Sequence, residues 1–428
     1  MKKQLVALTL LLSLTAQAEV LPPPDWLSSA TVYQVFIRNH TGDGTFEAAT
    51  ETLQQARDLG VNTLYLLPFY PTGKIKRIGV LGSPFSIRDY QNVDPNLGSL
   101  DDFKAYLEKA HSLGLKVVID LVLNHTSWDN KLITEHPEFY KHDASGQILP
   151  PRPEWQDVAG LDSTREDTQQ HLISIGEFWA NLGVDGFRAD YSDGLPLAFW
   201  QKFRTHMKAI NPQFLLLAET GDEAFHDRAF DLSYDWVGMS KAVAAVSGLS
   251  SANSFFNYQA DQGNVPKLRY LENHDQDRIA SKLKEDFQKK AVAALLLTEP
   301  GVPLIYAGQE WGIDHRPNLF DPDPVLWNQG NSDLHAFYQK LLSTRSKLPA
   351  LQSGALKTIS AQSRNVAAFE RFTPEQKVTV LINFAAEPQT VNFKDPQNAV
   401  DQLSGKTFQG MSWVLQPGEA QILLPASQ

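Results

Sequence analysis

The chain of 428 residues contains no cysteine. This absence excludes a disulfide framework, a thiolate metal site and a lipid-modified cysteine, so a hydrophobic core must hold the fold together. Acidic residues outnumber basic residues by 49 to 38, and the formal net charge is −11 at pH 7. Because an acidic chain repels phosphate backbones and anionic membranes, we expect no nucleic-acid partner and a neutral ligand instead.

An apolar run at the N-terminus of the sequence predicts export. Lys2 and Lys3 precede an apolar run at 5–14, and Ala16 and Ala18 form a small-residue cleavage site. This order is typical of a signal peptide over residues 1–18, whereas the alternative, a buried N-terminal helix, does not explain the charged and small flanks. The run is too short to span a membrane. We therefore expect a periplasmic or secreted protein without membrane insertion.

Eight short apolar runs alternate with helical patterns along most of the chain. Such alternation predicts βα units and a parallel sheet, and eight units favour a closed (β/α)₈ TIM barrel. Ser99 and Asp102 form a capping box, which predicts the start of one of the helices. The expected strands are residues 32–37, 61–68, 116–123, 186–190, 214–219, 230–232, 267–272 and 302–308.

Two regions depart from this βα repeat. A long stretch at about 126–163 separates the third and fourth expected strands, and a connection of this length is usually functional. We expect it to form a short inserted domain over the mouth of the barrel. From residue 354 onward, short alternating strands joined by turn residues predict a β-sandwich. The expected organisation is thus a catalytic barrel at 19–350 and a C-terminal sandwich at 354–428.

Three acidic residues fall where a barrel places its active site, at the C-terminal ends of the strands. Asp190 ends the fourth expected strand, Glu219 ends the fifth, and Asp275 follows the seventh. Strand alternation places Arg188 beside Asp190, and a guanidinium favours an ionised carboxylate. The apolar strand before Glu219 favours a raised pKa, as a general acid requires. One such acid is often structural, but the set predicts catalysis by paired carboxyl groups.

Two histidines are expected at the same end of the barrel. His125 follows Asn124 after the third strand, and His274 precedes Asp275 after the seventh. Their side chains can donate hydrogen bonds to hydroxyl groups of a ligand. A zinc site is the alternative, but neither histidine has a second histidine or a cysteine at the usual spacing. The pattern therefore favours ligand binding over zinc.

These segments carry a resemblance to glycoside hydrolase family 13, the α-amylase family. DLVLNH at 120–125 resembles the first conserved segment of the family, and GFRAD at 186–190 resembles the second. Glu219 in its apolar run resembles the third, and NHD at 273–275 the fourth. GVPLIYAGQE at 301–310 resembles the eighth strand. The resemblance covers essentially the whole chain after the signal.

The resemblance implies a retaining α-glucan hydrolase that cleaves α-1,4-glucosidic bonds in starch or maltooligosaccharides by double displacement. Asp190 would be the nucleophile, Glu219 the general acid/base, and Asp275 the residue that stabilises the transition state. An α-glucosidase and a 4-α-glucanotransferase remain open alternatives, because the same residues serve those activities. A non-enzymatic glucan-binding protein is disfavoured, because it would be expected to lack a catalytic carboxylate.

The resemblance also implies substrate contacts, with two departures from the family pattern. His125, Arg188 and His274 would line the subsite of the glucosyl unit under attack. The family usually stacks a tyrosine on that unit, and here Phe85 keeps the ring without the hydroxyl. Many amylases carry Lys-His shortly after the nucleophile, whereas this chain has Asp-Gly at 193–194. We expect the second change to alter contacts with the leaving-group sugar.

Other ligands are less well defined by the sequence. Asn124 matches a position that often binds calcium in α-amylases, but calcium needs six to eight oxygen ligands and no other is evident. We therefore expect no required cofactor, with calcium as the open alternative, and a monomer that binds an α-glucan or maltooligosaccharide. Candidate platforms for further sugars are Trp128, Trp155, Phe69, Tyr70 and Phe320.

Overall fold

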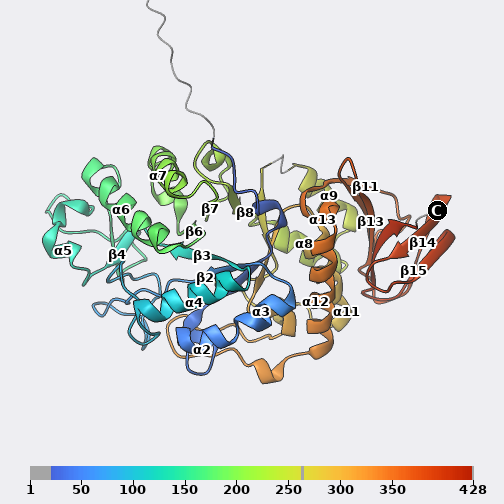
Figure 1. The fold of residues 1–428 in the computed structure, drawn as a ribbon, viewed down its shortest axis with the longest axis horizontal. Coiled ribbons are helices and arrows are strands. Elements are labelled where there is room, and N and C mark those ends of the chain that lie inside the picture. Colours follow the sequence, from blue (N-terminus) through green and yellow to red (C-terminus); the bar gives the residue numbers. More distant parts are fainter. Residues whose placement is uncertain (1–20, 262–264, 427–428) are drawn as a thin grey trace, which may run out of the picture.

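The computed structural model describes residues 21–261 and 265–426 (Figure 1). The predicted signal peptide lies outside these residues. A closed barrel of eight parallel strands forms the body of the protein, in the order β1-β10-β9-β8-β7-β6-β3-β2, which confirms the expected barrel. The strands are β1 (Val32–Val35), β2 (Thr63–Leu66), β3 (Lys116–Leu121), β6 (Gly186–Ala189), β7 (Leu215–Ala218), β8 (Leu232–Tyr234), β9 (Lys267–Tyr270) and β10 (Val302–Tyr306).

The strands end differently from their expected bounds, and the differences matter for the site. Asp190 and Glu219 are the first residues after β6 and β7, so each leaves the sheet at the barrel mouth. The strand expected at 230–232 begins later in the structure, where β8 covers Leu232–Tyr234. Asp231, just before β8, is buried and makes side-chain hydrogen bonds. Its carboxylate accepts hydrogen bonds from the Arg204 guanidinium at 2.6 Å and from the Leu216 backbone N–H at 3.0 Å.

Helices surround the barrel, because strands buried on both faces need an apolar layer outside as well as inside. The predicted capping box is present at α4 (Leu100–Ser112), where Ser99 and Asp102 exchange side-chain-to-backbone hydrogen bonds. The other helices are α1 (Ile37–His40), α2 (Phe46–Glu51), α3 (Leu53–Leu59), α6 (Glu166–Leu182), α7 (Leu197–Ile210), α8 (Gly238–Val246), α9 (Ala252–Asp261), α10 (Ile279–Lys282), α11 (Asp286–Thr298), α12 (Ser332–Lys347) and α13 (Pro349–Ser353).

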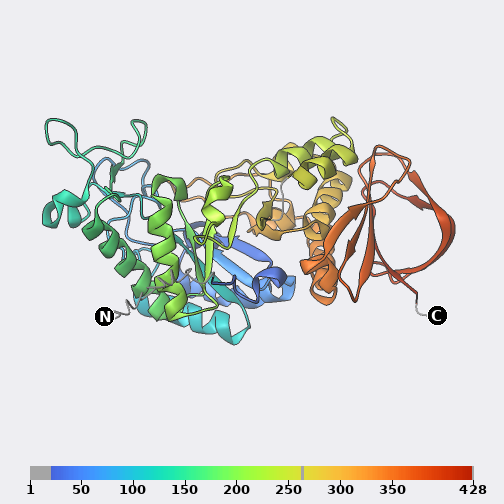
Figure 2. The same ribbon diagram turned by 90° about the horizontal axis from the view of Figure 1, so that it is seen from above.

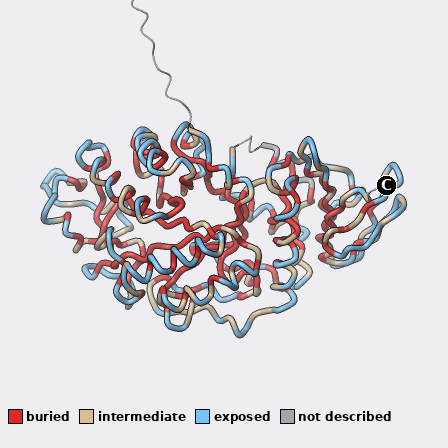
Figure 3. Tube along the Cα trace, viewed as in Figure 1, coloured by how far each residue is buried: buried red, intermediate tan, exposed pale blue. Residues whose placement is uncertain are grey.

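The barrel interior is packed with side chains and is not a pore. Buried residues are concentrated along the central strands (Figure 3). Tyr65, Leu217, Tyr234 and Leu304 are among the apolar residues that fill it. A larger cluster lies between the strands and the helices. A rigid, filled barrel of this kind holds the residues at its upper rim in fixed positions. No helix in the described part of the chain is long and apolar enough to cross a membrane.

The segment between β3 and β6 forms a small unit of its own beside the barrel mouth. β4 (His125–Ser127) and β5 (Val158–Gly160) pair as an antiparallel two-stranded sheet, and α5 (Leu132–Glu135) lies between them in sequence. Loops of this unit project from the left end of the molecule (Figure 2). His125 is the first residue of β4, so it belongs to the insert and not to the barrel.

The C-terminal region is all-β, as expected, and forms one continuous antiparallel sheet in the order β11-β12-β13-β16-β14-β15. The sheet folds over on itself (Figure 2), and both halves contribute to one core that includes Leu381 and Trp413. Arg371 joins this region to the barrel by donating to the Thr298 carbonyl at 2.6 Å. The strands are β11 (Ala355–Thr358), β12 (Val366–Phe372), β13 (Lys377–Asn383), β14 (Gln389–Asp401), β15 (Thr407–Leu415) and β16 (Ala420–Pro425).

Candidate active site

The three predicted carboxylates line one cavity of about 510 Å³ at the C-terminal ends of the barrel strands. Asp190 follows β6, Glu219 follows β7, and Asp275 lies in the connection after β9. The predicted binding residues His125, His274 and Phe85 line the same cavity, and Arg188 lies beneath it. The barrel thus brings together residues that are widely separated in sequence.

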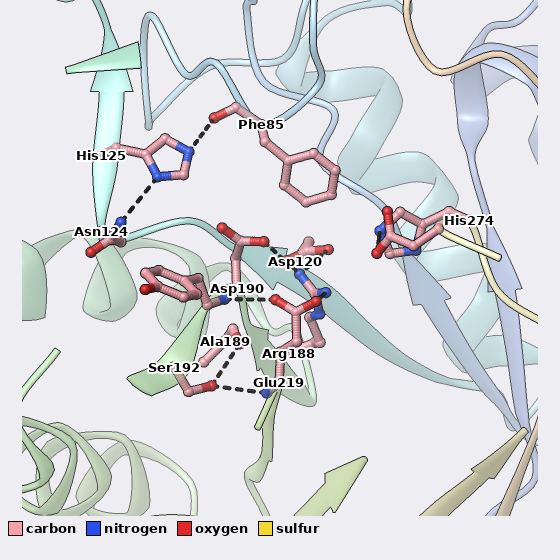
Figure 4. Close-up of polar contacts among 12 residues, drawn as sticks. Phe85, Asp120, Asn124, His125, Arg188, Ala189, Asp190, Ser192, Glu219 and His274 are labelled. Atoms are coloured by element: carbon pink, nitrogen blue, oxygen red, sulfur yellow. Dashed lines mark hydrogen bonds and ion pairs between the residues drawn. The ribbon is translucent and has the colours of Figure 1, made fainter. Parts of the chain in front are cut away.

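A single buried guanidinium organises the acids (Figure 4). Arg188 Nη1 donates to Asp190 Oδ1 at 2.9 Å, and Nη2 forms an ion pair with Glu219 Oε1 at 2.6 Å. The expectation that Arg188 and Asp190 share a strand face is therefore correct. However, Arg188 also contacts Glu219, so its charge does not by itself distinguish a nucleophile from a general acid.

Asp120 and Tyr65 hold this guanidinium in place from below. Asp120 is fully buried and accepts hydrogen bonds from Arg188 Nη1 at 2.9 and 3.2 Å. Its Oδ2 also accepts the Tyr65 hydroxyl at 2.6 Å. Because Asp120 lies beneath the barrel mouth and its oxygens are occupied, it acts on the site through Arg188, which it orients.

Ser192, at the start of a short 3₁₀ helix, links the ends of the two strands that carry the acids (Figure 4). Its hydroxyl donates to the Ala189 carbonyl at 2.8 Å and accepts the Glu219 backbone N–H at 2.8 Å. The next contact fixes the side chain, since Glu219 Oε2 accepts the Tyr191 backbone N–H at 2.7 Å. Tyr191 has a positive φ of 43°, which turns this N–H toward the acid. Sequence analysis did not identify either residue.

Burial dominates the electrostatics of the two acids. It raises the pKa of Glu219 to about 7, although Arg188 opposes the shift. It also raises the pKa of Asp190, and the neighbouring Asp120 carboxylate adds to that effect against Arg188. Two carboxyl groups close to one cation therefore retain a proton near neutral pH, because both cannot ionise without strong repulsion. A pair with one proton has the form that acid-and-nucleophile chemistry needs.

His274 presents a neutral ring to the cavity. Burial lowers the pKa of His274 to about 4. Gln34 Nε2 donates to His274 Nδ1 at 2.9 Å, so the ring proton is on Nε2. That nitrogen lies 3.1 Å from Asp275 Oδ2, whose side chain is 45% exposed. His274 is thus oriented to donate toward the mouth of the cavity, and Gln34 is a polar residue in a barrel strand that the sequence analysis overlooked.

A buried ion pair closes the connection that carries His274 and Asp275. Glu272 and Arg278 are both 0% exposed, and Arg278 Nη1 donates to Glu272 Oε1 at 2.7 Å. The second Glu272 oxygen accepts the Ile279 backbone N–H. Arg278 also lies over the Tyr306 ring, 4.2 Å from its centre. These contacts fix both ends of the loop that presents Asp275.

The insert supplies His125, whose two nitrogens both have protein partners. Nε2 donates to the Phe85 carbonyl at 3.2 Å, and Asn124 Nδ2 lies 3.4 Å from Nδ1. Burial lowers the pKa of His125 to about 4. The ring therefore supports the Phe85 backbone, in addition to lining the cavity where a sugar contact was predicted.

Asn124, the position that the resemblance links to calcium, is buried just before the first strand of the insert. A Cβ on Gly194 would lie 2.6 Å from Asn124 Oδ1, so only a glycine fits beside this oxygen without a shift. Within residues 21–261 and 265–426, no group of three or more His, Cys, Asp or Glu side chains is placed to hold a metal ion.

Of the five predicted aromatic platforms for further sugars, two line the cavity and three do not. Trp155 and Phe320 line the cavity, whereas Phe69 and Tyr70 are buried in the core behind it. Trp128 lies under Lys76, whose Nζ is 3.7 Å from the ring centre, and does not line the cavity.

Phe85 and one unexpected aromatic residue complete the lining. Phe85 stacks on His274 with ring centres 5.5 Å apart and ring planes inclined by 26°, so His274 holds the orientation of the Phe85 ring. Trp236, which follows β8, also lines the cavity and stacks on Tyr234. Its partly exposed position after a barrel strand is a signal that sequence analysis could have used.

A parallel (β/α)₈ barrel that gathers carboxyl groups around one arginine at its mouth has the architecture of a glycoside hydrolase. The family model "Alpha amylase, catalytic domain" matches residues 34–147 and 152–347. The chain belongs to the α-amylase family, glycoside hydrolase family 13.

Relatives with solved structures share the fold over almost the whole chain. An α-amylase from Lactobacillus plantarum is 31% identical with a TM-score of 0.87, and the match covers 94% of this chain and 99% of that one. The maltogenic α-amylase AmyB from Thermotoga neapolitana is 26% identical with a TM-score of 0.86, covering 94% and 100%. In sequence, α-amylase MalA of Haloarcula japonica is 28% identical over 410 residues, which cover 90% of this chain and 59% of MalA.

Proposed function

We propose that this protein hydrolyses α-1,4-glucosidic bonds in starch or maltooligosaccharides with retention of configuration. The observation that carries the proposal is the contact of Asp190 and Glu219 with the same guanidinium at the edge of one cavity. Retention requires the two carboxyl groups to be about 5–5.5 Å apart. Their common contact with the Arg188 guanidinium keeps the two acids near each other and so supports this mechanism. The relatives named as α-amylases support the substrate class.

In the first step, Asp190 is the nucleophile. Its Oδ1 is held by Arg188, and Oδ2 has no hydrogen-bond partner among the described residues, which leaves it directed to the substrate. Oδ2 forms a bond to the anomeric carbon while the bond from that carbon to the glycosidic oxygen breaks. Glu219 gives its proton to that oxygen, and the shortened glucan leaves as an alcohol. Glu219 must release a contact with Arg188 or Tyr191 to reach it.

In the second step, water replaces Asp190 on the sugar. The Glu219 carboxylate accepts one proton of the water, whose oxygen forms a bond to the anomeric carbon as the bond to Asp190 breaks. Both residues return to their starting states, and two inversions give net retention. The Asp275 carboxylate stabilises the positive charge that develops on the sugar. The Nε2 proton of His274 is donated to a sugar hydroxyl, and Phe85 supports the ring from one side.

The test compares Asp190→Asn and Glu219→Gln with Asp101→Asn, an exposed residue on α4. We expect Asp190→Asn to abolish hydrolysis of maltoheptaose, and Glu219→Gln to lower kcat by about 10²–10⁴-fold, as general acids do. Proton NMR of the first product should show the α-anomer. Full activity in Asp190→Asn, or an initial β-anomer, contradicts the proposal. Growth of longer oligosaccharides in the same reaction would identify a glucanotransferase instead.

We further propose that the protein is exported and acts as a monomer without a required cofactor. The order of charged, apolar and small residues at 1–18 supports export. N-terminal sequencing of protein from the periplasm or medium should begin at Glu19. A start at Met1 in that fraction contradicts cleavage.

A further inference from the structure

A wall on one side of the cavity is formed by two loops that are distant in sequence. The first is residues 72–87, between β2 and α4, closed at its base by the bridge between Thr72 and Ile87. The second is residues 318–321, between β10 and α12. Ile78 and Phe85 from the first loop, and Phe320 from the second, line the cavity. We call residues 78–82 together with 318–321 the rim wall.

Hydrogen bonds from backbone and side-chain groups join the two parts of the rim wall. The Leu81 N–H donates to the Phe320 carbonyl at 2.8 Å, and the Val80 N–H donates to Asp321 Oδ1 at 2.8 Å. Arg38, which follows β1, donates through Nη1 to the carbonyls of Gly82 and Leu319 at 2.9 and 3.1 Å. Loops from three neighbouring strands are therefore joined into one piece.

The two loops also approach each other too closely for a side chain at their contact. Gly79 has a φ of 67°, and a Cβ there would lie 2.6 Å from Phe320 Cβ and 2.7 Å from the Phe320 carbonyl oxygen. The same loop is fixed on its other side by the insert, where the Lys74 N–H donates to Asp129 Oδ2 at 3.0 Å. Both loops of the rim wall are thus held in place by contacts with each other and with the insert.

The barrel order places the rim wall opposite the general acid. β10, β1 and β2 are neighbours, and β1 lies four strands from β7 in either direction around the barrel. Glu219 follows β7, and the acid must contact the glycosidic oxygen, beyond which the leaving sugar lies. The part of the substrate that becomes bonded to Asp190 must therefore extend away from Glu219, across Phe85, toward the rim wall.

We propose that the rim wall closes the glycone side of the cleft, so that the enzyme accepts the non-reducing end of a glucan chain and releases short products from it. This inference rests on the proposed function. The inner face of the wall is apolar, with Ile78, 47% exposed, beside Phe320. Such a surface packs against a terminal glucosyl unit and offers no passage for a chain that continues.

The experiment compares p-nitrophenyl maltoheptaoside with a free non-reducing end and the same compound blocked there by a 4,6-O-ethylidene group. We expect the free substrate to be cleaved at least tenfold faster than the blocked one. Equal rates overturn the inference and leave the proposed hydrolase intact. Cleavage of neither compound overturns the proposed function, and the inference with it.

A variant locates the effect in the rim wall. Ile78→Ala/Phe320→Ala should raise the ratio of blocked to free cleavage severalfold, because it opens space next to the terminal sugar. Leu149→Ala, an exposed leucine of the insert that does not line the cavity, is the matched control and should leave the ratio unchanged. An unchanged ratio in a folded double variant, as judged by circular dichroism, overturns the assignment to these residues. If that variant does not fold, the ratio for the wild-type protein still decides the inference.

Discussion

Replacement of Glu272 by alanine should lower both the free energy of unfolding and kcat, because this buried residue holds the loop that presents Asp275. Both members of the pair with Arg278 are 0% exposed, and each Glu272 oxygen has a partner. Loss of one partner leaves a buried charge unpaired, which costs about 3–5 kcal/mol. The exposed pair of Lys104 and Asp101 should cost about 0–1 kcal/mol when broken, and serves as the control.

Urea unfolding followed by tryptophan fluorescence measures the cost, and steady-state kinetics measures the effect on the loop. A shift of about 1 Å in Asp275 is expected to lower kcat by about 10²-fold with little change in KM. The double variant Glu272→Gln/Arg278→Met removes both charges and keeps an acceptor for the Ile279 N–H. It should recover most of the stability but not kcat. Recovery of both together, or a loss below about 1 kcal/mol in Glu272→Ala, would refute the positioning role.

Three other predictions follow from the site. The rate should have a bell-shaped dependence on pH, with an alkaline limb near 7, because Glu219 loses its catalytic proton as pH rises through its raised pKa; an alkaline limb above pH 9 in kcat/KM profiles argues against this acid. Asp275→Asn should lower kcat strongly yet change unfolding free energy by less than about 0.5 kcal/mol, since the side chain is 45% exposed; a large stability loss would mean a structural residue. Prolonged dialysis against EDTA should leave maltoheptaose hydrolysis unchanged, because Asn124 is the one calcium ligand that the resemblance suggests, whereas calcium needs about six to eight oxygens; calcium-restored activity is the contrary result.

Much of the barrel could be predicted because its strands are buried on both faces and read as short apolar runs. The strands of the C-terminal sheet are harder to delimit from the sequence, because two of them show little apolar alternation. β11 is an almost fully exposed edge strand, so it has no apolar alternation to detect. β15 contains Gly410 and exposes most of its side chains, which weakens the same signal. Their pairing depends on neighbours distant in the sequence.

The candidate acids could be identified because strand ends converge at the mouth of a barrel. Their division of labour was predicted from the family resemblance, and the contacts of Arg188 do not add to it, because this arginine contacts Asp190 and Glu219 alike. The contacts made by Ser192 and by the Tyr191 backbone also depend on how the ends of β6 and β7 meet. These are properties of the closed barrel, and no local pattern of residue types encodes them.

The balance of charge around Arg188 has a consequence for inhibition. One guanidinium faces three carboxyl groups, those of Asp120, Asp190 and Glu219. The floor of the cavity therefore carries a net negative charge even when one of these groups keeps its proton. A sugar mimic with a basic ring nitrogen would add the missing positive charge at the position where the transition state develops it. Iminosugars should therefore bind more tightly than neutral sugars of the same shape, and the protonated amine should carry that preference.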